Sequence, residues 1–470
     1  MSLVISNNVG ALNARNNLAK STSALNKSIE RLSSGFKVNR GADGPAALVI
    51  SEKQRAQIAG LRTAIDNTEK AVSVVQTAEG ALNEINNILV KVRSLALDSA
   101  NAGVNDADAF AANQAEIDNA LDTINRIAAN TQFGERRLLD GSAGVTGTPD
   151  DADITFLRGT SDTSAGTYAV AVTTAAERAN VSAGTSQTGN LAANETLTVN
   201  GTAIQLNAGL DRNGVISRIN EFSSITGVVA EDNSGTTRLR SVEFGSAAEI
   251  EVSSDTASAT TSSGFGTTTL SDIGVDIAGT IDGTAGSGAG NVLSSVSGSS
   301  KGVTVRVAEN SSNLTETVTS TQGNVSVQRN ALVFQIGANQ NQTADIAIQN
   351  VSADGLGLAV SGSRFNSLNE IDITSADKAQ EALAVIDQAS DELSNIRGEL
   401  GAFQANTLES IGSNLRTTLE NTVNAESVIR DTDFAEEISK FTNNQILVQA
   451  GTSVLSNANQ TTQSILSLLR

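Results

Sequence analysis

Residues 434–469 read FAEEISKFTNNQILVQAGTSVLSNANQTTQSILSLL, and this stretch decides how the rest of the chain is interpreted. Residues three or four apart keep one spacing throughout it, which is the spacing of a heptad seam on a long helix. The seam positions are Phe434, Ile438, Phe441, Gln445, Val448, Thr452, Leu455, Asn459, Thr462, Leu466 and Leu469. Because several are polar, one helix cannot form a core on this stripe. The stretch therefore predicts a helix that needs partner helices, with polar positions that keep association reversible.

Composition narrows the functions open to this chain. The 470 residues are 39% hydrophobic, enough for buried cores, but only 3% are aromatic. The formal net charge of −20 argues against nucleic acid and anionic membranes as partners, because both would repel this surface. Histidine and cysteine are both absent, which removes imidazole bases, thiolate nucleophiles, disulfides and most metal sites. We therefore expect no cofactor and no catalytic activity.

Targeting signals are absent from the sequence pattern. The segment Met1–Gly10 lacks a basic start followed by an apolar stretch, and no run of about 18 apolar residues occurs anywhere. We expect neither a cleaved secretory signal nor a transmembrane helix. On this ground alone the chain would be cytoplasmic.

The N-terminal part of the chain has the same helical periodicity. One seam passes through Ile5, Val9 and Leu12, and a second seam, shifted by one residue, follows it. The second seam comprises Leu18, Thr22, Leu25, Ile29, Leu32 and Phe36. Gly35 suits the position after a helix end, and Gly44-Pro45 suits a helix start. A short loop over 35–44 is therefore predicted between two helices.

The next helix should run from Pro45 to Ala100, about 80 Å, which is too long to be stable without partners along its length. Its seam comprises Ile58, Leu61, Ile65, Thr68, Val72, Val75, Leu82, Ile85, Leu89 and Val92. Gly103 and Asn105-Asp106 should end it, and a third helix over about 117–127 should fold back along it.

Another long helix is predicted before the C-terminal one, although glycine interrupts it at 398, 401 and 412. Its apolar positions are Leu383, Ile386, Leu393, Ile396, Leu400, Phe403, Leu408, Ile411 and Leu415. Residues 430–433, Arg-Asp-Thr-Asp, supply capping side chains for the last helix.

The middle of the chain differs from both ends, because it is rich in Gly, Ser and Thr, which favour turns and short strands. Alternating residues predict strands at 197–200, 303–307 and 325–327. The fold class is therefore mainly α with inserted β: long antiparallel coiled-coil helices from both ends of the chain, and a β-rich middle region that protrudes.

Several motifs that could suggest a binding or catalytic site are better explained as ordinary solvent-exposed structure. The cluster Asp150-Asp151-Ala152-Asp153 lacks the Gly and distal Glu of a calcium loop, so a solvated loop is the better interpretation. Asn-x-Ser/Thr sequons follow from the abundance of Ser and Thr, and O-linked glycans cannot be located from sequence. Paired carboxylates such as Glu436-Glu437 are typical of a solvated helix face. The seams themselves leave open an intramolecular bundle without partners.

Two motifs at opposite ends of the chain resemble those of bacterial flagellins. Residues 32–39, LSSGFKVN, and 41–48, GADGPAAL, are similar to the N-terminal flagellin signature. Residues 445–455, QILVQAGTSVL, and 466–470, LSLLR, are similar to the C-terminal one. A third segment, 334–339, resembles the point where flagellins return from their variable domain, while 142–323 matches nothing recognisable.

The resemblance implies a structural subunit that polymerises into a flagellar filament for swimming motility. In this family the terminal helices line the filament interior, and the middle region projects outward. The chain would leave the cell unfolded through the type III export apparatus, guarded by an export chaperone, and would add at the tip beneath the filament cap. It would be extracellular without a cleaved signal. The alternative is a hook-filament junction protein with the same terminal helices, whereas the metallopeptidase found in some flagellin insertions is excluded because it needs histidine.

On these grounds we predict domains at 1–44 (N-terminal inner-tube helix), 45–141 (N-terminal shaft), 142–323 (variable insertion), 324–430 (C-terminal shaft) and 431–470 (C-terminal inner-tube helix). The predicted assembly residues are Ile5, Val9, Leu12, Leu25, Ile29, Leu32, Phe434, Ile438, Phe441, Val448, Leu455, Leu466 and Leu469. The predicted shaft-packing residues are Ile58, Leu61, Ile65, Val72, Leu393, Leu400, Ile411 and Leu415.

The resemblance also implies a surface for toll-like receptor 5. It assigns Leu89, Lys91, Arg93, Leu95 and Glu116 to that surface. Many flagellins carry Arg where this chain has Lys91 and Glu where it has Ser94, so a planar donor and a carboxylate are lost. We expect recognition to be weakened accordingly.

Overall fold

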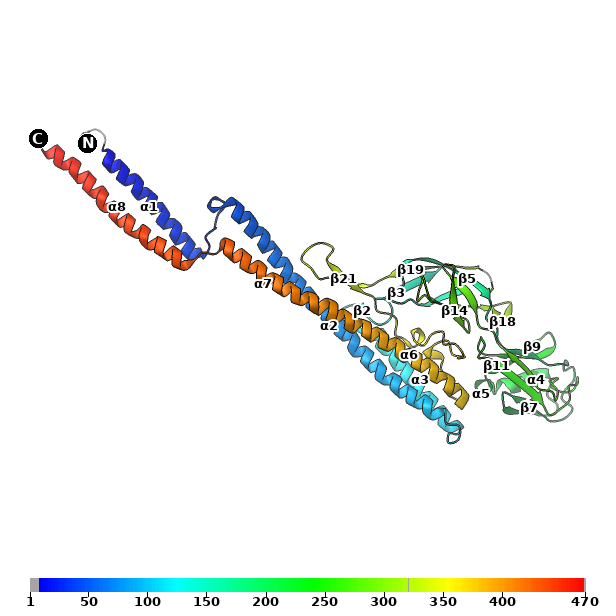
Figure 1. The fold of residues 1–470 in the computed structure, drawn as a ribbon. Coiled ribbons are helices and arrows are strands. Elements are labelled where there is room, and N and C mark those ends of the chain that lie inside the picture. The colour runs from blue at the N-terminus through cyan, green and yellow to red at the C-terminus, as the bar shows by residue number, and fades with distance from the viewer. Residues whose placement is uncertain (1–7, 320, 469–470) are drawn as a thin grey trace. The chain divides into compact units, whose positions relative to one another are not determined.

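The computed structural model describes residues 8–319 and 321–468, with the backbone alone at 321, 322 and 461–468 (Figure 1). The chain divides into two compact units. The first comprises Met1–Glu69, Gln335–Gln342 and Ser410–Arg470, and the second comprises Lys70–Phe334 and Thr343–Glu409. Each unit is described by itself.

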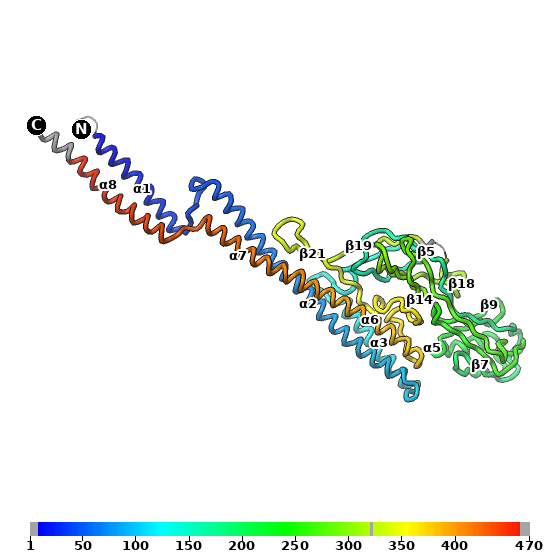
Figure 2. The backbone as a smooth tube through the Cα atoms, in the orientation of Figure 1, coloured from blue at the N-terminus to red at the C-terminus, as the bar shows by residue number. Residues whose placement is uncertain are grey.

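The first unit contains an antiparallel pair of helices, α1 (Val9–Ser34) and α8 (Phe434–Leu468), which run side by side in Figures 1 and 2. Gly35 caps the C-terminal end of α1 with a left-handed φ of 75°, and this confirms the predicted helix end. The predicted start of α8 is also confirmed, because the Asp433 carboxylate accepts the N–H groups of Ala435 and Glu436 at 2.9 and 3.2 Å.

The same unit contains the first part of α2 (Pro45–Ser99), packed antiparallel to α7 (Ser410–Arg430). Their contact is a small apolar cluster centred on Leu61, Ala64 and Leu415. The segment Gln335–Gln342 also belongs here: a Cβ added to Gly60 would come within 3.1 Å of the Ala338 methyl group. Glycine at position 60 therefore permits a close approach of this loop to α2.

The long helices of the second unit are the rest of α2, α3 (Ala107–Asn130) and α6 (Ala376–Ala402). The observed ends of α2 and the return of α3 agree with the sequence prediction. Buried residues of α2 repeat at alternating steps of three and four, and comprise Ala71, Val75, Ala78, Leu82, Ile85, Leu89, Val92 and Ala96. Leu393 of α6 and Ile117 of α3 are fully buried as well.

A π-helical segment, Phe403–Glu409, lies between α6 and α7 where an uninterrupted α-helix was predicted. The reason is visible in the spacing of the apolar positions, because Phe403 and Leu408 are five residues apart rather than three or four. One extra residue in a π turn brings Leu408 back to the buried face, where it is fully inaccessible.

The strands of the second unit form a large antiparallel sheet in the order β3-β19-β5-β13-β14-β15-β16-β4. Their bounds are β3 Val145–Pro149, β4 Ile154–Arg158, β5 Gly166–Thr174, β13 Ala278–Ile281, β14 Thr284–Ala289, β15 Val292–Ser295, β16 Thr304–Val307 and β19 Thr321–Arg329. The two edge strands approach each other, since a Cβ on Gly147 of β3 would collide with the Phe156 ring of β4. The sheet buries Tyr168, Val170 and Val305 on its inner face. The predicted domain boundary at residue 323 falls inside β19.

Residues 179–273 form a separate α/β lobe within this unit. Its two sheets have the orders β6-β10-β9 and β12-β11-β7-β8. The bounds are β6 Asn180–Ser182, β7 Glu195–Val199, β8 Thr202–Leu206, α4 Arg212–Asn220, α5 Ser223–Thr226, β9 Val228–Asn233, β10 Thr236–Ser241, β11 Glu249–Ser254 and β12 Leu270–Ile273. Leu197, Ile204, Ile219 and Leu239 are fully buried in its core. The observed β7, β16 and β19 confirm the three predicted strands.

Short elements complete the chain. They are the strands β1 Gln132–Phe133, β2 Arg136–Arg137, β17 Glu309–Asn310, β18 Asn313–Thr317, β20 Leu332–Gln335 and β21 Thr343–Ile346, and the 3-10 turns Gly41–Asp43, Ala353–Gly355 and Leu368–Glu370. Among the described residues, no helix is long and apolar enough to cross a membrane.

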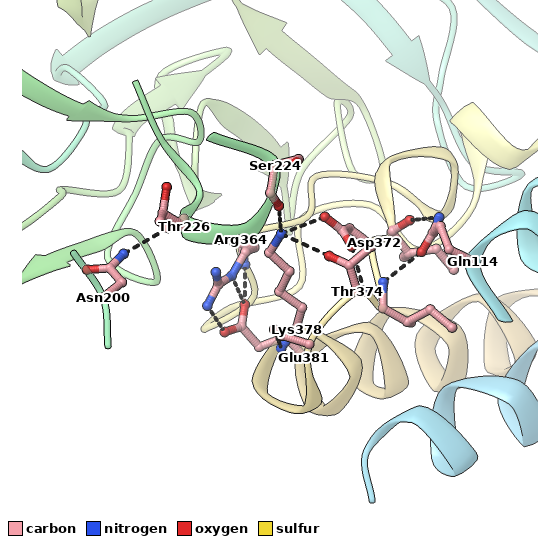
Figure 3. Close-up of polar contacts among 12 residues, drawn as sticks. Gln114, Asn200, Ser224, Thr226, Arg364, Asp372, Thr374, Lys378 and Glu381 are labelled. Atoms are coloured by element: carbon pink, nitrogen blue, oxygen red, sulfur yellow. Dashed lines mark hydrogen bonds and ion pairs between the residues drawn. The ribbon is translucent and has the colours of Figure 1, made fainter. Parts of the chain in front are cut away.

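The lobe is attached to α6 through Lys378 (Figure 3). The ammonium group donates to the carbonyl of Ser224 at 2.7 Å, to Asp372 at 2.6 Å and to Thr374 at 3.4 Å. Its side chain is only 7% exposed, so the charge depends on these acceptors in place of water. Beside it, Arg364 holds Glu381 through two hydrogen bonds.

Candidate functional site: the paired terminal helices

The α1–α8 pair is held by a heptad seam of alternating large and small residues. On α8 the buried or half-buried positions are Glu437, Phe441, Asn444, Val448, Gly451, Leu455 and Ala458. On α1 the corresponding positions are Ala11, Ala14, Leu18, Ser21, Leu25, Ser28 and Leu32. Both sets step alternately by three and four, so each helix turns one continuous stripe to the other.

This seam differs from the predicted one in four of the seven positions observed on α8. Phe441, Val448 and Leu455 belong to both, but Gln445, Thr452 and Asn459 are exposed, and their places are taken by Asn444, Gly451 and Ala458. The prediction was wrong here because it continued the stripe that begins with the large apolar Phe434 and Ile438, whereas small residues such as Gly451 and Ala458 allow the two helix backbones to approach. The polar positions of α8 that face α1 are therefore Glu437 and Asn444, and not Gln445, Thr452 and Asn459.

Large apolar side chains remain exposed outside the seam. Of the predicted assembly residues, Val9, Leu12, Ile29, Phe434 and Ile438 are 60, 55, 47, 53 and 53% exposed. Leu25, Leu32, Phe441, Val448 and Leu455 are half-buried toward the partner helix. The sequence prediction missed three further exposed residues on α8, namely Ile446, Leu447 and Val454. They lie off the predicted stripe, and an apolar set on more than one face of α8 was the signal that could have revealed them.

Three predicted positions cannot be placed in this way. Ile5 and Leu469 lie outside the described residues, and Leu466 lies in the part of α8 whose backbone alone is described. The predicted polar seam position Thr462 falls in that part as well.

Polar side chains connect α1 to α8 at both ends of the helix pair. At one end Asn8 donates through Nδ2 to the carbonyl of Ala458 at 3.0 Å. At the other end Arg31 approaches Glu437 at 3.5 Å, and the Glu437 side chain is only 5% exposed. A buried carboxylate depends on such a partner, so this pair marks the end of the seam nearest the loops.

The predicted shaft residues are distributed over both units. Leu61, Ile65, Ile411 and Leu415 meet in the α2–α7 cluster of the first unit. Ile58 and Val72 are half-buried on α2, whereas Leu393 and Leu400 are buried on α6. In α2 the buried stripe again runs one position away from part of the predicted seam, at Ala64 and Ala71 rather than Ile65 and Val72.

The residues assigned to receptor recognition do not form one surface. Leu89 is fully buried on the heptad stripe of α2, so its assignment to an exposed surface is corrected. Lys91 pairs with Glu116 at 2.6 Å and Arg93 with Asp387 at 2.6 Å, and all four side chains are about half exposed. Leu95 is half-buried. Of the five assigned residues, the accessible ones are therefore Lys91, Arg93 and Glu116, and each of them is part of an ion pair.

The Asp150–Asp153 segment has a local structural role. The Asp150 carboxylate accepts hydrogen bonds from the N–H and Nδ2 of Asn324, and these bonds lower its pKa. Asp151 accepts the N–H of Asp153 at 2.9 Å, as in an Asx turn. Within the described part of the chain, no group of three or more carboxylates is arranged to hold a metal ion.

Comparisons with known proteins identify the family to which this sequence is similar. The family model for the bacterial flagellin N-terminal helical region matches residues 5–144, and the model for the C-terminal helical region matches residues 383–469. The B-type flagellin of Pseudomonas aeruginosa is 33% identical over 531 residues, and the flagellin of Salmonella rubislaw is 32% identical over 509 residues, with all of each chain covered. Among solved structures, FliC from Burkholderia pseudomallei is 17% identical, with a TM-score of 0.24, over 71% of this chain and 98% of its own.

The matches confirm the resemblance seen in the two terminal motifs, and the long helices with a β-rich middle region confirm the predicted fold class. Both relatives span the whole of this chain at more than 30% identity. The chain belongs to the bacterial flagellin family.

Proposed function

We propose that this chain is the structural subunit that polymerises into the flagellar filament used for swimming, and that it has no catalytic role. The observation that supports this most directly is the exposed apolar surface on both terminal helices. Val9, Phe434, Ile438 and Val454 are each more than half exposed although α1 and α8 already cover each other. Exposed apolar surface of this extent favours burial against another molecule, and a second copy carries the same helices.

The proposal includes the route to the filament. The subunit is exported unfolded through the type III apparatus, is accompanied by an export chaperone in the cell, and adds at the tip beneath the cap and beyond the junction proteins. The small residues of the seam support this route, because Ala, Ser and Gly bury less apolar area than larger side chains would at the same positions. The final location is the extracellular filament.

Seeded elongation tests the proposal. Purified filaments are dissociated by heat, and the subunits are cooled with short filament seeds and followed by electron microscopy. Long filaments are expected, whereas growth that stops after a few copies would support the junction-protein alternative. Ile438→Asp should abolish elongation by placing a charge on the apolar surface. Gln205→Glu, which adds the same charge at an exposed position of β8, should elongate normally and is the matched control.

We further propose toll-like receptor 5 as a partner that recognises this chain weakly. Lys91, Arg93 and Glu116 are accessible, but each is already paired within the subunit, so a receptor must compete with those pairs. The exposed Ser94 also offers no carboxylate.

A further inference from the structure

The two helices of the terminal pair meet without a covalent turn between them. Helix α1 ends at Ser34 and α8 begins at Phe434, so almost the whole chain separates the ends that face each other. In most antiparallel helix pairs a loop of a few residues fixes how far one helix can slide along the other. Here the register needs another determinant.

The packing of side chains in the seam favours the observed register over other registers only slightly. Leu18 lies against Gly451, where an added Cβ would come within 3.2 Å of Leu18 Cδ1. Continuing this register along both helices gives the layers Ser21–Val448, Leu25–Asn444 and Ser28–Phe441. Each of these four layers therefore combines a large side chain with a smaller one.

A slip of one heptad preserves that complementarity. Moving α8 by seven residues, about 10 Å, gives the layers Leu25–Gly451, Ser28–Val448 and Leu32–Asn444. Large and small side chains still alternate, so packing alone discriminates poorly between the two registers. The slip would, however, separate Arg31 from Glu437 and Asn8 from Ala458, which are in contact in the observed register.

The segments that follow α1 and precede α8 are tied to each other. Phe36 and Asp431 form an antiparallel bridge. Two backbone hydrogen bonds flank it: the N–H of Lys37 donates to the carbonyl of Arg430 at 2.8 Å, and the N–H of Thr432 donates to the carbonyl of Gly35 at 2.9 Å. The bridge lies directly beside the end of α1 at Ser34 and the start of α8 at Phe434, so it restricts sliding of one helix along the other.

The side chain of Arg430 reinforces the bridge. Its guanidinium carbon lies 4.3 Å from the centre of the Phe36 ring, a cation–π contact, and the side chain is 16% exposed. The carboxylates of Glu52 and Glu426 lie at 3.6 and 3.8 Å from the same guanidinium group. Ser51 donates to Glu426 at 2.9 Å and holds that carboxylate in place. Arg430 therefore joins both connecting segments to the adjacent ends of α2 and α7.

We propose that Arg430 and Phe36 form a register clamp, which replaces the missing turn and fixes how α1 and α8 pair. Arg430 is a positioning residue, because it determines which residues of α1 lie opposite which residues of α8. The register in turn determines which exposed apolar side chains of the two helices are neighbours on the surface that other copies would contact. The consequence for assembly depends on the proposed function, whereas the clamp itself does not.

Disulfide trapping tests the clamp, because the chain has no cysteine of its own. Leu18→Cys with Gly451→Cys reports the observed register, since these positions are close enough for a disulfide. Leu25→Cys with Gly451→Cys reports the slipped register. Each pair is placed in full-length chain with Arg430 or with Arg430→Ala, the reduced subunits are offered to wild-type seeds, and intrachain disulfides are counted after oxidation in both the incorporated and the free chains.

With Arg430 present, the observed-register disulfide should predominate. In Arg430→Ala the ratio of slipped to observed disulfide should rise about fivefold, the effect of losing one cation–π contact. Phe36→Ala should act in the same direction and Phe36→Trp should restore the low ratio. Arg416→Ala is the matched control, because it removes an exposed pair with Glu69 from α7 and should leave the ratio unchanged.

Two outcomes separate the clamp from the proposed function. If Arg430→Ala and Phe36→Ala both leave the disulfide ratio unchanged, the clamp is wrong even when the wild-type chain elongates seeds. If the wild-type chain fails to elongate but the ratio still depends on Arg430, the clamp stands and the filament assignment is wrong.

Discussion

Arg158 on β4 and Glu392 on α6 form a two-fold ion pair, with Nη1 and Nη2 at 2.7 and 2.8 Å from the two carboxylate oxygens. Both side chains are nearly buried, at 12 and 11% exposure. The same carboxylate accepts the N–H of Gly357 at 3.0 Å, and Arg158 donates to the carbonyl of Gly355 at 3.1 Å. The pair therefore links the large sheet, the 3-10 turn and the helix.

Removing one partner of this pair should destabilise the second unit. Arg158→Ala leaves a nearly buried carboxylate without its cation, which costs about 3 kcal/mol in the free energy of unfolding. Urea denaturation followed by the fluorescence of Tyr168, the single tyrosine and buried in the sheet, measures the effect. Lys301→Ala, which breaks an exposed pair with Asp162, is the control and should cost less than about 1 kcal/mol.

The stability of the second unit should depend on pH through Glu243. Burial, and secondly the nearby Glu370 carboxylate, raise the pKa of Glu243 to about 7, although Arg178, Arg306 and Arg364 oppose the shift. Because the folded pKa lies above the ordinary value of 4.5, the stabilisation is complete below pH 4.5 and is lost as pH rises toward 7. The loss is up to about 3 kcal/mol.

Glu243→Gln should remove this slope. The free energy of unfolding of the variant and of the wild-type chain is compared from pH 5 to 8, a window in which no histidine titrates because the chain has none. The difference between the two should grow with pH in favour of the variant. Parallel curves would show that Glu243 does not titrate in this range.

Substitution of Lys378 should weaken the attachment of the lobe at residues 179–273 to α6. Lys378→Met removes the hydrogen bond to Ser224 and takes the ammonium group away from Asp372 (Figure 3). The hydrogen bond from Lys378 lowers the pKa of Asp372 although burial raises it, so the variant leaves a partly buried carboxylate without this cation. The expected cost is about 3 kcal/mol. Hydrogen exchange should accelerate in α5 and its flanks while remaining unchanged in the helices of the terminal pair; exchange unaltered at 223–227 would contradict the attachment role.

The π-helical segment should tolerate the loss of one residue. Deleting the exposed Asn406 reduces the spacing from Phe403 to Leu408 to four, which an α-helix accommodates without turning the following apolar face away. Circular dichroism and thermal unfolding should show a folded chain within about 1 kcal/mol of wild type. Deletion of the exposed Gln388 within α6 is the control, because it rotates the following seam by about 100° and should strongly destabilise the chain.

Recognition by toll-like receptor 5 should increase when the two divergent positions are changed. Lys91→Arg with Ser94→Glu restores a planar donor and a carboxylate on the exposed face of α2. A receptor reporter assay should give a stronger signal for this variant than for the wild-type chain. Equal strong signals from both would show that the two substitutions do not weaken recognition.

The helices were predictable because their determinants are local. Gly35, Pro45 and Asp433 mark helix ends by their own backbone chemistry, and the structure places ends there. The five-residue step from Phe403 to Leu408 is equally visible in the sequence, and it is the local signal of the π turn that the prediction of one α-helix does not include.

The exact faces of the helices were harder to predict. Two stripes one position apart share residues such as Phe441 and Val448, and hydropathy favours the stripe with larger side chains. Only the partner helix decides between them, and here it selects the stripe with Gly451 and Ala458. The contact of Arg430 with Phe36 is likewise invisible in sequence, because it joins residues almost 400 positions apart.

Strand β5 has consequences for when the molecule can fold. Its two neighbours come from much later in the chain: Val170 pairs with Ile281 of β13, and Tyr168 pairs with Val325 of β19. Pairing at such separation requires the closure of long loops and makes folding slow. On the export route proposed above, the sheet cannot be completed until both β5 and β19 are on the same side of the channel. The order of the strands therefore delays completion of the sheet until all of residues 166–329 lie on the same side of the channel.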